Sequence, residues 1–306
     1  MKKVSSNHPT RNVMAMAALA IAGSATVAYA MPSFTDFGSA ANLESMPGSA
    51  ASLNTPAVDG CASQSGDGLT LAFNSNRAGT HDIYIARRSS TSVGFGPPAK
   101  LPAPVNGAST DEFCPTIARG GKLYFSSTRS GDIGDFYVTR EGPKGWREPE
   151  NLGSNINSSM MDEAAAFYDD DDGNEVMLFS RRTAMGPGKL YQSVNRGPAT
   201  LVAGGPHSSA SDNRPSVTHD GRTIFFDSTR YGTLGGPDIW MATRSSTSQP
   251  FGTAVHLSAL SSPGFDARPS VSWDGKMLTF SSNRAGSEST APDIWYAERG
   301  RDVGQR

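Results

Sequence analysis

This sequence has little cysteine, little excess charge and few long hydrophobic runs. Its 306 residues include two cysteines and carry a formal net charge of −2. A charge so close to zero argues against a nucleic-acid partner. Long runs of Leu, Glu, Lys and Ala are also missing, whereas the 33 glycines and 20 prolines are plentiful. This composition favours many short strands and turns over helices.

A secretory signal peptide is predicted over residues 1–30. The basic start is followed by a short apolar core at residues 13–23 and by Ala-Tyr-Ala at residues 28–30, a small-residue cleavage site. The alternative, a membrane anchor, needs an apolar stretch of about 18 to 20 residues, and this one is shorter. We therefore expect no stable membrane insertion, a periplasmic or secreted protein, and a single domain over residues 31–306.

One sequence unit recurs at five places, roughly fifty residues apart. The copies begin at Leu71, Leu123, Val176, Ile224 and Leu278. An Asp-Gly or Gly-Gly pair precedes four of them by one or two intervening residues, and in the third unit such a pair lies a little further ahead. Self-similarity at a fixed period is typical of solenoids, propellers and arrays.

Each unit has the pattern of four antiparallel strands. In the last copy, two runs of alternating apolar residues within residues 268–284 are joined by Asp274-Gly275, a pair suited to a tight hairpin turn. A third run begins at Asp293, and short segments such as residues 251–257 supply a fourth strand in the other units. Four antiparallel strands form one blade of a propeller, and each blade needs neighbours to bury its faces.

The fifth unit has no fourth strand of its own after Glu298. A matching segment, Phe37 to Leu43, lies at the start of the region that follows the predicted signal peptide. We therefore predict an all-β fold, a five-bladed β-propeller with four antiparallel strands per blade. The N-terminal strand would complete the last blade and close the ring.

The unit S-x-D-G-x-x-[LI]-x-F-x-S-x-R-x-G…D-I-[YW] resembles the WD-like repeat of the TolB-like propeller family, known from exported bacterial proteins. The resemblance covers nearly all of residues 31–306 and implies a propeller. It does not specify a function, because propellers host binding, scaffolding and catalysis alike. The separate N-terminal domain of TolB has no counterpart here, so we do not expect the chain to be TolB itself.

An arginine follows the second strand of each unit, and in four units an aspartate precedes the third strand. Both flank one loop, so ion pairs that hold the loop ends are expected. The predicted pairs are Arg77 with Asp82, Arg129 with Asp135, Arg230 with Asp238, and Arg284 with Asp293. The third unit has Lys189 opposite Arg182, which indicates either sequence drift or an anion-binding edge.

A second polar set precedes each first strand, where the loops of all five units should surround the mouth of a central channel. The candidate ligand-binding residues at this mouth are Asp59, Asp111, Glu112, Asp162, Glu163, His207, Asp212, Arg214, Asp266 and Arg268. Alternatively, each aspartate caps its own turn.

This set permits several kinds of chemistry. Arg214 and Arg268 could form paired hydrogen bonds with a carboxylate or phosphate. Clustered carboxylates would suit Ca²⁺, although no cofactor is expected. The leading hypothesis is a monomeric binding or scaffolding module for a protein or glycan of the cell envelope. The alternative is a glycoside hydrolase or lyase that uses Glu112, Glu163, Asp212 or Asp266.

The cysteines, Cys61 and Cys114, occupy equivalent positions in consecutive units. Neighbouring inner strands converge near the axis, and an exported protein meets an oxidising compartment. Either an inter-blade disulfide or two buried thiols would fit. The acidic run Asp169 to Asp172 fits a solvated turn or a Ca²⁺ loop, although its acid spacing departs from the alternation that such loops need.

Overall fold

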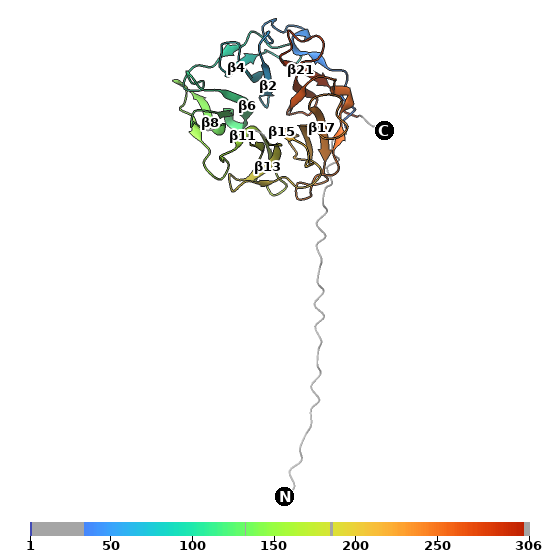
Figure 1. The fold of residues 1–306 in the computed structure, drawn as a ribbon. Coiled ribbons are helices and arrows are strands. Elements are labelled where there is room, and N and C mark those ends of the chain that lie inside the picture. The colour runs from blue at the N-terminus through green and yellow to red at the C-terminus, as the bar shows by residue number, and fades with distance from the viewer. Residues whose placement is uncertain (2–33, 132, 184–185, 303–306) are drawn as a thin grey trace. The chain divides into compact units, whose positions relative to one another are not determined.

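The computed structural model describes Met1 and residues 34–131, 133–183 and 186–302. The predicted signal peptide lies outside these residues apart from Met1, and the structure does not test it. The described residues from Phe34 onward form one compact unit in which five sheets surround a central axis (Figure 1). Within the described ranges the helices are three short 3₁₀ turns: η1 (Leu43–Ser45), η2 (Arg119–Gly121) and η3 (Ser258–Leu260). None of the helices in those ranges is long and apolar enough to cross a membrane.

Each sheet is a blade, and in blades one to four the main strands follow chain order from the axis outward. Blade one contains β2 (Asp59–Gln64), β3 (Thr70–Ser75), β4 (Asp82–Arg87) and β5 (Ala99–Lys100). Blade two contains β6 (Glu112–Ala118), β7 (Lys122–Ser127), β8 (Asp135–Gly142) and β10 (Glu150–Asn151), with β9 (Gly145–Trp146) paired to β8. Blade three contains β11 (Met161–Asp169), β12 (Glu175–Arg182), β13 (Lys189–Val194) and β14 (Thr200–Leu201). Blade four contains β15 (Asp212–Val217), β16 (Thr223–Ser228), β17 (Asp238–Thr243) and β18 (Val255–His256).

Blade five joins the two ends of the described chain. It contains β19 (Asp266–Val271), β20 (Met277–Ser282), β21 (Asp293–Glu298) and, on its outer edge, β1 (Ala41–Asn42). Ala41 pairs with Tyr296 in antiparallel register. The predicted all-β, five-bladed propeller is therefore confirmed, including its closure by an N-terminal strand, which is shorter than the predicted segment.

The Asp-Gly turns form for a local reason. At the β19–β20 hairpin, the carboxylate of Asp274 accepts hydrogen bonds from the Ser272 hydroxyl at 2.7 Å and from the Lys276 N–H at 3.1 Å. Gly275 then takes φ of +75°, which a residue with a side chain rarely adopts. This turn chemistry joins the first two strands tightly.

The hydrophobic core lies between neighbouring blades. The second strand of every blade contributes a phenylalanine at an equivalent position that is at most 1% exposed: Phe73, Phe125, Phe179, Phe226 and Phe280. One cluster combines Ala72 and Ile83 of blade one with Leu123 and Phe125 of blade two. Burying one such side chain stabilises a fold by about 1.5–3 kcal/mol, so the blades depend on one another.

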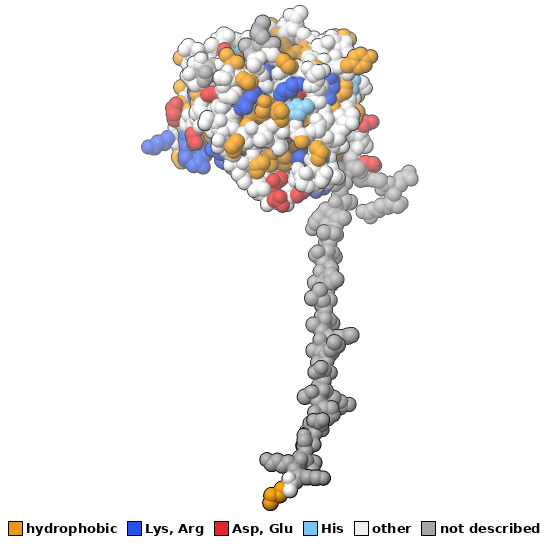
Figure 2. All heavy atoms as spheres, turned by 60° about the horizontal axis from the view of Figure 1, so that its bottom comes forward, with side chains coloured by type: hydrophobic (Ala, Val, Ile, Leu, Met, Phe, Trp, Pro, Cys, Tyr) orange, Lys and Arg blue, Asp and Glu red, His pale blue; other side chains and the backbone are white. Residues whose placement is uncertain are grey.

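The outer surface mixes residue types. On the face shown in Figure 2, hydrophobic, basic, acidic and histidine side chains are interspersed. No single sign of charge covers that face, as the net charge of −2 would suggest.

Every inner strand contains one non-glycine residue in the left-handed region, at the point where its pairing register shifts. These residues are Cys61, Cys114, Ala164, Arg214 and Arg268, with φ between +43° and +60°. All five line the space around the axis, and we call them the axial ring. The bulge thus places one side chain from each blade at the same level of the channel.

Candidate functional site at the upper mouth

The predicted partner of the repeated arginine is wrong. In each blade an arginine pairs with an acid at the start of the inner strand, instead of the residue that opens the third strand. In blade three this arginine is Arg181, not the predicted Arg182, which pairs with Glu163. The pairs are Arg77–Asp59 (2.5 Å), Arg129–Glu112 (3.2 Å), Arg181–Asp162 (2.6 Å), Arg230–Asp212 (2.6 Å) and Arg284–Asp266 (2.6 Å). The predicted pairs Arg77–Asp82, Arg129–Asp135, Arg230–Asp238 and Arg284–Asp293 do not form. We call the observed pairs the blade clamps.

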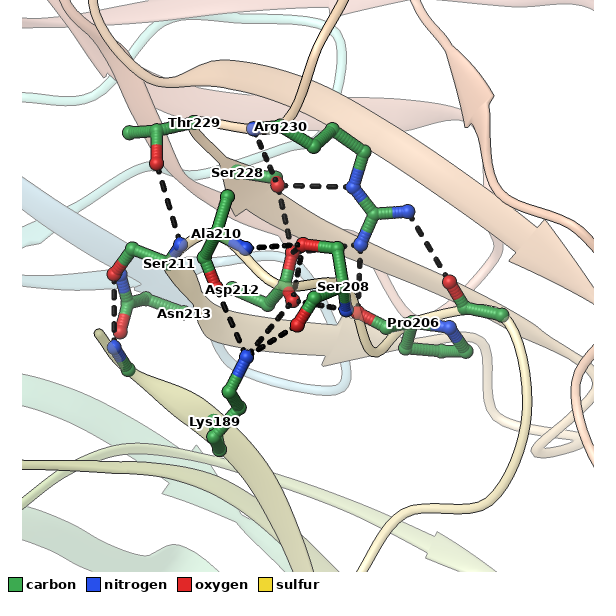
Figure 3. Close-up of polar contacts among 12 residues, drawn as sticks. Lys189, Pro206, Ser208, Ala210, Ser211, Asp212, Asn213, Ser228, Thr229 and Arg230 are labelled. Atoms are coloured by element: carbon green, nitrogen blue, oxygen red, sulfur yellow. Dashed lines mark hydrogen bonds and ion pairs between the residues drawn. The ribbon is translucent and has the colours of Figure 1, made fainter.

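The clamp of blade four shows why the arginine turns inward (Figure 3). Arg230 donates through Nε to the Ser228 hydroxyl at 2.9 Å, and through Nη1 and Nη2 to the carbonyls of Gly205 and Pro206 at 3.1 and 2.7 Å. The second oxygen of Asp212 accepts the Ser208 N–H at 2.7 Å. The loop before the inner strand therefore supplies most of the acceptors, and the clamp fixes that loop.

These contacts reassign most of the predicted ligand residues. Asp59, Glu112, Asp162, Asp212 and Asp266 are fully buried in clamps and do not face the channel. In blade two the clamp acid is Glu112, so the alignment that placed Asp111 in this role is wrong by one residue. His207 also lies away from the mouth lining, and its buried Nε2 has no hydrogen-bond partner among the described residues.

The aspartates of the third strand serve the outer strand of their blade. Asp82 pairs with Lys100 at 2.7 Å and Asp238 with His256 at 2.8 Å. Asp135 accepts from Asn151 at 3.0 Å, and Asp293 accepts from Asn42 at 3.4 Å. These four residues thus tie the third strand to the fourth.

Lys189 replaces that aspartate in blade three and has a different role. Its ammonium donates to the carbonyls of Ser208 and Ala210, at 2.5 and 2.9 Å, and lies 3.8 Å from the Asp212 carboxylate (Figure 3). The lysine therefore links blade three to the clamp of blade four. It is neither drift nor an open anion-binding edge.

Four of the ten predicted mouth residues do meet in one open space of about 490 Å³ above the axial ring. We call this space the upper mouth; its lining comprises His81, Asp111, Phe113, Thr128, Ile133, Met161, Glu163, Arg182, Arg214 and Arg268. The inner strands, the loop before β6, the end of β12 and the β3–β4 and β7–β8 loops supply these residues. The lining thus brings three guanidinium groups together with two carboxylates.

Glu163 lies between two of these arginines. Its Oε1 is 3.0 Å from Arg214 Nη2 and 3.2 Å from Arg182 Nε. Burial acts to raise the pKa of Glu163, but the guanidinium groups of Arg214 and Arg182 outweigh it and hold that pKa below its ordinary value. Glu163 is therefore an ionised counterion at neutral pH.

Arg268 differs from the other two arginines. Its buried Nε and Nη1 have no hydrogen-bond acceptor among the described residues. Burial, with Arg214 nearby, lowers the pKa of Arg268 to about 10, so the group stays charged at pH 7. Among the described residues at the base of the upper mouth, this guanidinium has two unsatisfied donor atoms, whereas Arg214 has one, its Nε.

Asp227 was not predicted from the sequence, although it stands where other repeats have Asn74, Ser126 or Ser281. Its carboxylate lies 3.5 Å from Arg214 Nη1, and it is 1% exposed. Burial raises the pKa of Asp227 to about 6. An acidic residue at a position that is Asn or Ser in the other repeats was the sequence feature that could have identified Asp227.

A disulfide joins Cys61 and Cys114, with Cα atoms 4.8 Å apart. It packs with Ala164 and Phe113 on the side of the axial ring away from the two arginines. Of the two alternatives left open by the sequence, the structure has the disulfide. The covalent link holds the inner strands of blades one and two together at the base of the upper mouth.

The acidic run of blade three is used in contacts between blades. Asp169 pairs with Arg119, and Asp171 lies 3.3 Å from Arg222. Asp170 accepts from the N–H groups of its own turn. Across the part of the chain that the structure describes, no group of three or more His, Cys, Asp and Glu could hold a metal ion.

No family model and no curated protein sequence matches the chain. Among solved structures, a protein assigned as a TolB from Agrobacterium tumefaciens is 21% identical, over 76% of this chain and 72% of that chain, with a TM-score of 0.47. The arabinanase Arb43A from Bacillus subtilis is 12% identical, over 80% and 95%, with a TM-score of 0.53. A GH43_1 enzyme from Xanthomonas citri is 16% identical, over 84% and 91%, also with a TM-score of 0.53.

These likenesses concern the fold alone, because the identities are low. The five four-stranded blades, built on the repeated sequence unit, confirm the five-bladed propeller expected from the sequence. The chain is thus a five-bladed β-propeller in its architecture.

Proposed function

We propose that this chain is an exported binding module that holds an anionic group of its partner at the upper mouth. The observation that carries this proposal is the Arg268 guanidinium, whose Nε and Nη1 are buried without an acceptor among the described residues. A buried donor left unpaired costs about 1–3 kcal/mol. A carboxylate or phosphate would relieve that cost and gain a charge-assisted hydrogen bond.

The surroundings of Arg268 are prearranged for such a contact. The residue lies on an inner strand, its N–H is fixed by Asp227, and the disulfide closes the other side of the ring. A rigid donor loses little conformational freedom on binding. The partner's anion would therefore meet a site that needs little rearrangement.

Apolar residues beside the charges favour a protein partner of the cell envelope. Phe113, Ile133 and Met161 line the upper mouth, and Ile133 is 43% exposed. Tyr231 and Leu234, in the β16–β17 loop at the same end of blade four, are 103% and 54% exposed. Exposed apolar side chains around a polar centre are typical of an interaction surface.

The geometry supports a glycoside hydrolase less well. Such enzymes use two carboxyl groups on opposite sides of the scissile bond, one of them protonated before the reaction. Glu163 is held ionised by two arginines, and Asp227, with a pKa of about 6, is buried beneath Arg214. Neither residue combines a proton with access to a substrate.

Calorimetric titration with a pentaglutamate peptide and with inorganic phosphate tests the binding proposal. Arg268→Gln should weaken binding about tenfold, because a hydrogen bond to a charged group is worth about 1.5–3 kcal/mol. Arg87→Gln removes an exposed arginine far from the channel and should leave binding unchanged. Equal affinities in all three proteins would overturn the proposal. Hydrolysis of aryl glycosides by the wild type that is lost in Glu163→Gln would favour the enzyme instead.

A further inference from the structure

A second space lies below the axial ring, at the opposite end of the channel. This lower cavity has a volume of about 420 Å³ and is lined by the inner strands of all five blades. Its opening lies at the hairpins between the first and second strands, whereas the upper mouth lies where the inner strands begin. A space of this size is within the range of small-molecule sites.

The wall of the lower cavity presents mainly apolar groups. The residues directly after the axial ring are small or apolar: Ala62, Pro115, Ala165, Pro215 and Pro269.

At the second position after the axial ring, three hydroxyl groups form hydrogen bonds to the inner strand of a neighbouring blade. Ser63 Oγ accepts the Ile117 N–H at 3.3 Å, and Ser216 Oγ accepts the Val271 N–H at 2.9 Å. Thr116 Oγ1 donates to the Ala165 carbonyl at 2.6 Å. A ligand body in the cavity would therefore meet hydrocarbon in place of free polar groups at these positions.

Four side chains from corresponding positions of blades two to five meet over the opening. They are Arg119, Asp169, His219 and Trp273, and we call them the lid. His219 stacks on Trp273 with ring centroids 3.8 Å apart, and Arg119 Nη2 lies 3.3 Å from His219 Nε2. Arg119 also pairs with Asp169, and its guanidinium lies 5.3 Å from the centre of the Trp273 ring.

The lid consists of side chains that water reaches. Trp273 is 43% exposed, and the side chains of Arg119 and Asp169 are 55% and 38% exposed. Exposed ion pairs contribute only about 0–1 kcal/mol, so Arg119 can exchange Asp169 for another carboxylate at little cost. Rotation of these side chains opens the cavity without any change in the backbone.

We propose that the lower cavity binds a small amphipathic carboxylate, with its apolar body inside and its carboxylate on Arg119 at the lid. Burial of the body supplies affinity through the hydrophobic effect, and the guanidinium selects the acid over neutral analogues. This site opens at the other end of the channel from the upper mouth, although Arg214 and Arg268 line both spaces. The proposal does not depend on the function proposed above, because it assigns the carboxylate to Arg119.

The test uses 4-phenylbutyrate and 4-phenylbutanol as matched probes in calorimetry with the whole protein. The wild type should bind the acid about tenfold more tightly than the alcohol. Arg119→Gln should reduce the acid to the affinity of the alcohol, whereas Lys276→Gln, which removes an exposed cation near the same hairpins, should not. Ser270→Phe, which fills the cavity, should abolish binding of both probes and leave phosphate binding at the upper mouth intact. Equal binding of acid and alcohol by the wild type would overturn the proposal.

A second measurement covers the case in which Ser270→Phe does not fold. Bound 4-phenylbutyrate should protect Trp273 from quenching by acrylamide, and this protection should be missing in Trp273→Phe. Quenching that is unchanged by saturating 4-phenylbutyrate would contradict the assignment.

Discussion

The carboxylate of Asp227 in blade four accepts a hydrogen bond from the backbone N–H of Arg268 in blade five, at 3.0 Å. The N–H groups of two other axial-ring residues make the same link to the preceding blade. Cys61 donates to Ser281 Oγ at 3.1 Å, and Cys114 donates to Asn74 Oδ1 at 3.2 Å. The left-handed residues therefore fasten neighbouring blades at the axis, which keeps the arginines of the upper mouth in fixed positions.

Substitution of Asp293 by asparagine should stabilise the protein at neutral pH. Burial raises the pKa of Asp293 to about 6, so the folded protein favours the protonated carboxyl. The stability that this preference contributes is present below about pH 4 and is lost as the pH rises through 6. Melting temperatures should therefore rise by several degrees for Asp293→Asn at pH 7.5 and be unchanged at pH 3.5. Asp82→Asn is the matched control and should be destabilising at pH 7.5, because Lys100 then loses its partner.

Loss of one clamp should destabilise the whole ring. In Arg230→Gln the fully buried Asp212 loses its guanidinium partner, which should cost about 3–5 kcal/mol in free energy of unfolding. Chemical denaturation measures this cost. Arg87→Gln breaks a surface pair in which both side chains are more than half exposed, and it should change stability by no more than about 0.5 kcal/mol. Similar values for the two variants would contradict the structural role of the clamps.

Replacement of Lys189 by aspartate, the residue found at this position in the other blades, should be unfavourable. The new carboxylate would face the carbonyls of Ser208 and Ala210 and lie near Asp212. We expect a loss of about 2–3 kcal/mol in free energy of unfolding. Lys189→Met keeps the apolar stem without the charge and should lose less. If the aspartate variant melts at or above the wild-type temperature, the observed link between blades three and four is not important for stability.

The disulfide should make a large contribution to stability. Cys61 and Cys114 are separated by 53 residues in the chain. A cross-link that closes a loop of this length is worth about 4 kcal/mol when its effect on the unfolded chain is counted. The double variant Cys61→Ser/Cys114→Ser should show this loss in denaturant unfolding, and the wild type should match it under reducing conditions. A reduced wild type as stable as the oxidised protein would contradict this estimate.

The blades were predictable because their signals are local. Alternating apolar residues predict a strand, and an Asp-Gly pair predicts a hairpin turn. The repeat of about fifty residues corresponds to one blade. The missing fourth strand of the last unit also indicated that Phe37 to Leu43 closes the ring. These features depend on near neighbours in the chain or on comparison between repeats.

The partner of each arginine was not predictable in this way. Asp82 is nearer to Arg77 in the sequence than Asp59, which made the loop pair the natural prediction. The inward direction of Arg77 is set by the carbonyls of Ser52 and Leu53, which lie in the loop before the inner strand. Every residue has a backbone carbonyl group, so residue types alone do not show which carbonyls will accept these hydrogen bonds.

The sequence also did not predict which of two adjacent acids joins a clamp, or that each inner strand has a bulge at the axial ring. In blade two, Asp111 and Glu112 are neighbours in the sequence, and the ion pair of Glu112 with Arg129 and its strand register opposite Ser127 show which acid belongs to the clamp. The left-handed positions carry Cys, Ala or Arg, whereas the usual signals for that backbone are Gly and Asn.

The pairing of β1 with β21 has a consequence for the order of the chain. Phe34 and Arg301 form a bridge beside this pair, so the ends of the described domain are adjacent in space. The two chain ends meet in blade five, but a hydrophobic cluster lies between neighbouring blades at every junction of the ring. A circular permutant that links these ends and opens the chain in the loop between β4 and β5 should therefore fold to the same ring, with its two chain ends in blade one.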